Sequence, residues 1–126
     1  MSENPPKWNP PPIPEQNFYI LKHRKPVRCR SMKKWGKWFN RNNRRVRKTY
    51  INNFRISTVF LALDHNYSDN GPPILFETMI FNSTNDDVYC VRCSTWREAL
   101  NNHWAAVCHA EGLYLSKEDQ SNVPRT

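Results

Sequence analysis

The chain has no long apolar run and only three glycines among its 126 residues. A membrane-spanning helix needs about 18 or more apolar residues in succession, so this class of protein is excluded. The phosphate-binding loops rich in glycine, the nucleophile elbow and the H-E-x-x-H motif are also missing. The first residues, MSENPPKWNPPPIP, lack the charged and apolar regions of a signal peptide. We therefore expect an intracellular protein without a membrane partner.

Acidic residues are missing from residues 22–55, which hold 14 of the 19 lysines and arginines. Residues 1–21 carry a net charge of −1 and residues 56–126 a net charge of −5, which leaves +8 for the chain. A basic surface attracts phosphate-rich partners because binding releases their counterions. We expect nucleic acid or another polyanion to contact Lys33, Lys34, Lys37, Arg41, Arg44, Arg45, Arg47 and Lys48. The alternative is that this stretch pairs with the acidic C-terminal half or only maintains solubility.

Proline separates the start of the chain from the rest, since six of the ten prolines fall within residues 5–14. Proline lacks an N–H donor and restricts the residue before it, so residues 1–16 are predicted to form a disordered arm. Residues 116–126 are predicted to form a disordered tail. The single domain is therefore expected over residues 17–115.

Alternating and helical patterns predict the elements of this domain. Two short strands are predicted over 17–22 and 26–30, and four longer ones over 45–51, 54–65, 74–81 and 88–94. Ser31 can cap a helix with apolar residues at helical spacing, and Thr95 with Glu98 forms a capping box for a helix that ends near Ala110. The predicted fold is α+β, an antiparallel β-meander packed against two short amphipathic helices.

One face of the predicted sheet carries a mixed set of polar side chains. If His65 pairs with Ile74 and Phe81 with Val88, then Glu77 lies opposite both Ala62 and Arg92. The candidate pocket on this face consists of Asp64, Glu77, Arg92 and Ser94. The alternative is an ordinary cross-strand ion pair between Glu77 and Arg92.

The sequence contains weaker indications of metal binding and of catalysis. Cys90 and Cys93 have the spacing of a zinc knuckle, but residues three apart on a strand point to opposite faces. We therefore expect no metal and no cofactor. Acid/base side chains occur at Asp64, His65, Glu77 and His103 without a known catalytic signature, so no catalytic residue is assigned. A small enzyme of unknown reaction is the third interpretation of the chain.

Three segments resemble a family of small, poorly characterised proteins of bacteriophages and prophages. They are STVFLALDH (57–65), GPPILFETMIF (71–81) and RCSTWREA (92–99). Ala62 stands where the family pattern has glycine, and Cys93 stands where it has an aromatic residue. The resemblance implies a protein that acts in the host cytoplasm and transfers no settled activity. It adds an alternative function, a binder of a bacterial host protein or of a small, nucleotide-like molecule that acts against a defence or regulatory pathway. The oligomeric state stays open.

Overall fold

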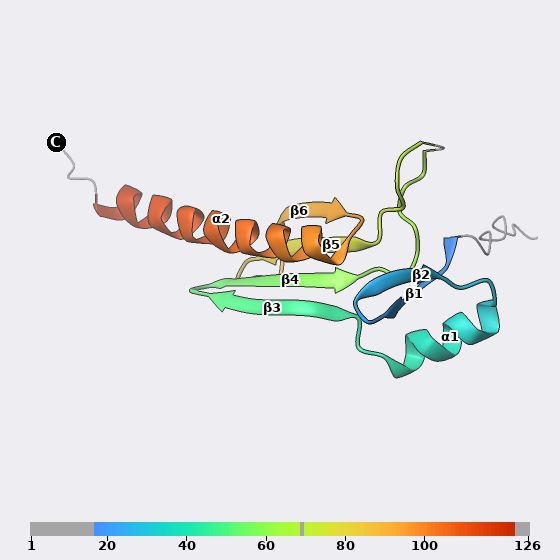
Figure 1. Cartoon of the computed structure of the whole chain (residues 1–126). Helices are drawn as coiled ribbons and strands as arrows, with labels where there is room; N and C mark the ends of the chain where they lie inside the picture. The colour runs from blue at the N-terminus through green and yellow to red at the C-terminus, as the bar shows by residue number, and fades with distance from the viewer. Residues whose placement is uncertain (1–16, 69, 123–126) are drawn as a thin grey trace, which may run out of the picture.

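The computed structural model describes residues 17–68 and 70–122, with side chains up to residue 113 (Figure 1). The predicted arm over 1–16 and the last four residues lie outside this part. A hairpin of β1 (Tyr19–Lys22) and β2 (Lys25–Arg28) comes first, followed by α1 (Met32–Arg41). A four-stranded sheet follows, and α2 (Trp96–Asn122) ends the described chain. The strands of the larger sheet are β3 (Arg45–Ile51), β4 (Phe54–Phe60), β5 (Phe76–Phe81) and β6 (Asp87–Cys93).

The four-stranded sheet has the order β3-β4-β5-β6, and every neighbouring pair is antiparallel. The fold is therefore a small single-domain α+β fold, as the sequence predicts. The hairpin β1-β2 forms a separate two-stranded sheet at one end of the larger sheet (Figure 1).

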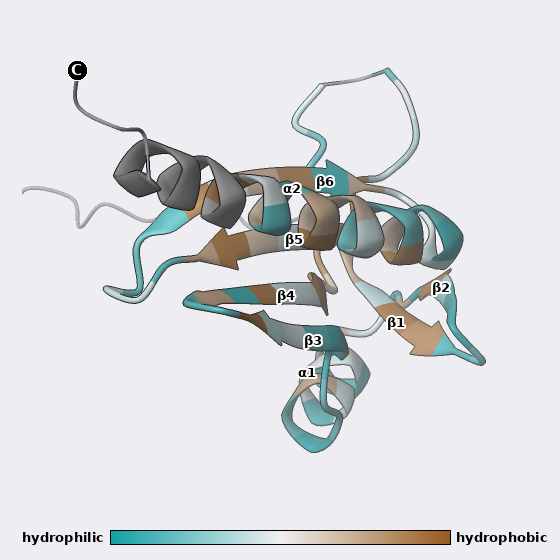
Figure 2. Ribbon diagram, turned by 90° about the vertical axis from the view of Figure 1, so that its left-hand side faces the viewer, coloured by the Kyte–Doolittle hydropathy of each residue, from teal (hydrophilic) through white to brown (hydrophobic). Residues whose placement is uncertain are grey.

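Helix α2 covers one face of the four-stranded sheet (Figure 2). Alternate residues of β4 and β5 are buried beneath it, because successive side chains of a strand point to opposite faces. On the helix, small or flat side chains recur at helical spacing and face the sheet. The buried positions are Phe54, Ile56, Thr58, Phe60, Phe76, Thr78 and Ile80 on the strands, and Ala99, His103, Ala106 and Ala110 on α2.

Helix α1 lies beyond one end of the sheet, where its aromatic side packs on the core. Ser31 caps the helix by accepting a hydrogen bond from the Lys34 backbone N–H at 3.3 Å. The Trp35 indole N–H is shared between the backbone oxygens of Tyr19 (3.1 Å) and Ala62 (3.0 Å). The rings of Trp38 and Phe60 meet edge to face, 5.7 Å apart. This packing joins α1 to both the hairpin and the end of β4.

The prediction that the strand of β4 continues to His65 is wrong. The strand ends at Phe60, and Ala62 adopts a positive φ of 64°. That conformation costs an alanine free energy. The backbone N–H groups of Leu61 and His65 still donate to Leu75 O (2.7 Å) and Ile74 O (2.9 Å), so the predicted contact of His65 with Ile74 is present. Between them the chain turns at Ala62, whose carbonyl accepts from the Tyr19 backbone N–H at 2.9 Å. Thr58 and Phe60 are consequently buried, although the expected register, with Glu77 opposite Ala62, would place them on the same face as Glu77 and away from the core.

Further predictions need correction. Glu77 lies opposite Val59, not Ala62, while its predicted pairing with Arg92 is confirmed. Phe81 pairs with Asp87 and not with Val88, because the register of β6 shifts between Ile80 and Phe81. Helix α2 continues to Asn122, so it is not short, and residues 116–122 belong to it and not to a tail. The reason is that no proline interrupts the chain between Trp96 and Asn122, and Gly112 is tolerated inside the helix. Among the described residues, no helix combines the length and the apolar character needed to cross a membrane.

Candidate nucleic-acid interface

The outer side of α1 holds half of the predicted polyanion-binding residues. They are all exposed, and their spacing places them within one side of the helix: Lys33, Lys34, Lys37 and Arg41. The first turn of α1 contains no acidic residue. Like charges three or four residues apart repel each other on a helix. This side of α1 therefore carries a concentrated positive charge, of which Arg41, in the last turn, favours the helix dipole and the three lysines do not.

The other four predicted residues do not share one surface. The Arg44 guanidinium lies 3.9 Å from the centre of the Phe39 ring, at the junction of α1 and β3. Arg47 lies 4.7 Å from the centre of the Trp104 ring and thus on the side of the sheet that α2 covers. Arg45 pairs with Val59 and Lys48 with Ser57. Both belong to the opposite side of the sheet.

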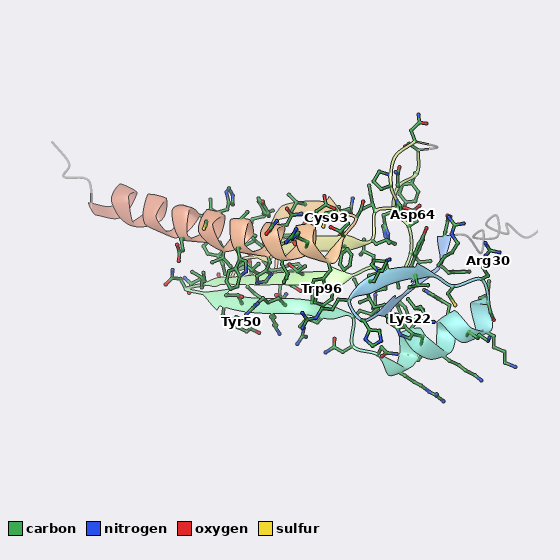
Figure 3. The ribbon with its side chains drawn as sticks, viewed as in Figure 1. Lys22, Arg30, Tyr50, Asp64, Cys93 and Trp96 are labelled. Atoms are coloured by element: carbon green, nitrogen blue, oxygen red, sulfur yellow. The ribbon has the colours of Figure 1, made fainter. Side chains whose placement is uncertain are left out.

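We call this opposite side the open face, because no helix of the described chain lies over it (Figures 1 and 2). The strand register arranges its side chains in three rows across the sheet. Figure 3 shows Tyr50 on the side of β3 away from α2. The rows are Arg45, Val59, Glu77 and Arg92; then Lys48, Ser57, Met79 and Cys90; then Tyr50, Arg55, Phe81 and Asp87.

Sequence reasoning missed Tyr50 and Arg55 as members of a surface with Lys48. The strands predicted over 45–51 and 54–65 leave two residues between them, Asn52 and Asn53, and a two-residue turn fixes the register of its hairpin. Counting outward from Ile51 and Phe54, that register places Tyr50 opposite Arg55. The two-residue length of the turn was therefore enough to place Tyr50 opposite Arg55.

A cation lies near each of two aromatic rings of the open face. The Lys48 ammonium lies 5.2 Å from the centre of the Tyr50 ring, and the Arg55 guanidinium lies 4.2 Å from the centre of the Phe81 ring. The Lys48 ammonium, as a hydrogen-bond donor and as a charge, lowers the pKa of Tyr50, with the charges of Arg55 and Arg45 adding to it. The field on this part of the sheet is therefore positive.

Ion pairing does not neutralise the basic stretch within the described structure. The described side chains form one ion pair, between Arg92 Nε and Glu77 Oε2 at 2.8 Å. Neither partner belongs to residues 22–55. No ion pair among the described side chains therefore supports the alternative that the basic stretch pairs with the acidic half.

The four residues of the candidate polar pocket lie in three places. Glu77 and Arg92 pair on the open face. Asp64 accepts hydrogen bonds from the backbone N–H groups of Asn66 (2.7 Å) and Ile74 (2.9 Å), which fixes the connection between β4 and β5. Ser94 lies at the start of α2 instead. The structure therefore brings together only Glu77 and Arg92.

Ser94 lines a cavity of about 460 Å³ beside the β1-β2 hairpin. Its walls include Arg24, Leu75 and Trp96, and the Arg24 guanidinium lies 5.6 Å from the centre of the Trp96 ring. The Trp96 indole N–H is buried and has no acceptor among the described residues. Figure 3 shows Trp96 close to the hairpin. A buried donor without an acceptor is costly, so this end of α2 has an unused hydrogen-bonding group.

The cysteines and His103 occupy unrelated environments. Cys90 lies on the open face, whereas Cys93 packs against the core, and burial raises the pKa of Cys93 to about 11. Among the described side chains, those of residues 17–68 and 70–113, no three His, Cys, Asp or Glu groups gather as metal ligands. His103 is fully buried, with its Nδ1 2.8 Å from Thr58 Oγ1 and its Nε2 2.8 Å from Thr49 Oγ1. These contacts join α2 to the sheet.

Comparison of the chain with known protein families, with curated proteins and with solved structures gave no match. The arrangement of the chain's own residues is therefore the basis for a proposal about its function.

Proposed function

We propose that this protein binds nucleic acid without catalysing a reaction, and that cations of α1 and of the open face contact the phosphates. The observation that supports the proposal most is the lack of any ion pair between residues 22–55 and a described acidic side chain. Fourteen cations without acidic neighbours in that stretch repel one another, and a polyphosphate relieves the repulsion.

Phosphate contacts make a quantitative prediction about salt. Each contact releases counterions, so the logarithm of the affinity falls with the logarithm of salt concentration by about 0.9 per phosphate on a duplex. Four contacts from α1 alone would lower the affinity about a hundredfold between 50 and 200 mM salt. The contacts are with the backbone of the nucleic acid, so they confer little preference for sequence.

The test compares two variants of equal net charge. Lys34→Gln with Lys37→Gln removes two positive charges from α1, and Asn101→Glu with Ala105→Glu changes the net charge equally on exposed positions of α2. Fluorescence anisotropy with labelled duplex DNA and RNA gives the affinity and its salt dependence. We expect the α1 variant to lose about tenfold in affinity and about 1.8 in slope. The control variant should keep the slope of the unmodified protein.

Equal losses in the two variants would mean that net charge alone attracts the nucleic acid and that α1 is not an interface. No binding by the unmodified protein near physiological salt would contradict the proposed function. The basic stretch would then serve solubility.

A second candidate function is the binding of a small anionic ligand in the cavity beside the hairpin. It is favoured by the unpartnered Trp96 indole N–H and by Arg24, which together offer a donor, a ring and a positive charge. Calorimetric titration with nucleoside mono-, di- and triphosphates tests it. Binding that Arg24→Ser abolishes would support this function, whereas no heat from any of them at millimolar concentration would contradict it.

A further inference from the structure

The open face combines aromatic rings with cations in a single row. Tyr50 pairs with Arg55, which pairs with Phe81, so a guanidinium lies between two rings on three adjacent strands. Tyr50 is 67% exposed and lies near the turn of the β3-β4 hairpin, on the edge strand of the sheet. Exposure of a large ring on a sheet face has a cost, because the ring remains in contact with water. A partner with flat apolar surfaces would cover the ring and so remove this cost.

The charge on this face is uneven across the strands. Arg45, Lys48 and Arg55 place three cations on β3 and β4. On the far side, Glu77 is already paired with Arg92, and Asp87 lies opposite Phe81 at the start of β6. A polyanion is therefore favoured along β3 and β4, beside Tyr50.

The spacing of the two rings decides between a single strand and a duplex. Neighbouring strands lie about 4.8 Å apart, so rings on β3 and β5 are separated by roughly 10 Å. Bases that stack on both rings must be unstacked from each other, because stacked bases are about 3.4 Å apart. In a duplex the base faces are covered by their neighbours. In a single strand they can separate and lie against aromatic side chains.

The two cations that now lie over the rings can serve the backbone of such a strand. Lysine and arginine have long side chains that move their charged ends while the stems stay in place. Lys48 can therefore turn from the ring to a phosphate, which frees the ring face for a base. Arg55 also donates a hydrogen bond from Nη2 to Asn85 Oδ1 at 3.2 Å, and a phosphate oxygen would replace this acceptor. The half-buried Met79 belongs to the row of Lys48, next to the row of Tyr50 and Phe81, and adds apolar surface to the same area.

We propose that the open face binds single-stranded nucleic acid, with bases stacked on Tyr50 and Phe81 and phosphates held by Lys48, Arg55 and Arg45. This inference depends on the proposed function and adds the substrate class. The α1 side then attracts any nucleic acid, and the open face distinguishes single strands from duplexes.

The experiment uses two exposed tyrosines. Tyr50→Ala removes the ring on the open face, and Tyr67→Ala removes a ring that is 88% exposed in the connection between β4 and β5. Anisotropy is measured with a single-stranded oligonucleotide and with the duplex of the same sequence. We expect Tyr50→Ala to weaken single-strand binding by about five- to a hundredfold, with duplex binding within twofold of the unmodified protein. Tyr67→Ala should change neither affinity.

Tyr50→Phe provides a second variant that keeps the stacking surface, and it should bind the single strand as the unmodified protein does. The salt slope of Tyr50→Ala should also be unchanged, because the ring contacts no phosphate. Thermal unfolding of each variant checks that the fold is intact.

Three results would overturn the inference. If single strand and duplex bind equally and Tyr50→Ala changes neither affinity, the open face is not a binding site. The proposed function could still be supported in that case by the loss of affinity in the α1 variant. Equal losses on both substrates would make Tyr50 a general contact without strand selectivity. A dimer that Tyr50→Ala dissociates, detected by light scattering, would show that a second copy of the chain occupies the face. Failure of both substrates to bind near physiological salt would instead contradict the proposed function itself.

Discussion

The two faces of the four-stranded sheet are built from alternate residues of the same strands, yet they differ in how their polar groups are satisfied. Beneath α2, Thr58 Oγ1 lies 2.8 Å from Thr78 Oγ1 and 2.8 Å from His103 Nδ1, so the hydroxyls and the imidazole satisfy one another. On the open face, the charges of Lys48 and Arg55 meet aromatic rings and no described carboxylate. One face therefore joins its polar groups to one another in the core, whereas on the other Lys48 lies against a ring and Arg55 against a ring and the Asn85 side chain.

The largest difference is expected from matched aromatic truncations on the two faces. Phe60→Ala removes a fully buried ring that contacts Trp38 and Phe76. We expect it to lower the free energy of unfolding by about 3–5 kcal/mol. Tyr50→Ala on the open face should lower it by less than about 0.5 kcal/mol. Urea denaturation measures both. Similar losses for the two variants would mean that the open face is also part of the core.

A smaller difference is expected from hydroxyl groups at adjacent positions of β4. Thr58→Val leaves the imidazole Nδ1 of His103 and the hydroxyl of Thr78 each without one partner, and an unsatisfied buried group costs about 1–3 kcal/mol. Ser57→Ala on the open face removes a hydroxyl that water can replace, so its effect should stay within about 0.5 kcal/mol. The same denaturation experiment ranks the two. If Ser57→Ala cost more, the network beneath α2 would not stabilise the fold.

The smallest effect is expected from pH. Burial, with the nearby positive charge of Arg47, lowers the pKa of His103 below its ordinary value of 6.5. The unfolded chain therefore takes up a proton at His103 more readily than the folded chain does. Stability should be complete above pH 6.5 and should decrease as the pH falls below it toward the lowered pKa.

The pH experiment compares unfolding at pH 7.5 and pH 5. In His103→Gln this part of the pH dependence should disappear, whereas His23→Gln, at an exposed turn, should retain it. If His103→Gln showed the pH dependence of the unmodified protein, other groups would cause it.

The sequence predicted the parts of the fold in which local pattern and register agree. The alternation of β5 and β6, together with the turn between them, was sufficient to pair Glu77 with Arg92. The end of β4 could not be predicted, because an alanine at a positive φ has no local signal. Its conformation comes from hydrogen bonds with Tyr19 and Trp35, which are distant in sequence. That error inverted the faces of β4.

Only part of the candidate site could be predicted from the sequence, because the register of a strand again determined the rest. A charge count locates the basic stretch, since composition needs no geometry, and the spacing of α1 places four cations together. The division of Arg45, Arg47 and Lys48 between the two faces could not be predicted, because the register of β3 shifts between Arg45 and Arg47. Such an irregularity changes which residues share a surface.

The shared indole hydrogen bond of Trp35 has a consequence for how the molecule opens. The donor contacts carbonyls 16 and 27 residues away, so detachment of α1 breaks its bonds to both the hairpin and the turn at Ala62, which also bond to each other. These segments should exchange their amide hydrogens as one cooperative unit, separate from the sheet beneath α2. A ligand held by the lysines of α1 would then slow exchange in the hairpin as well, although it touches neither strand of it.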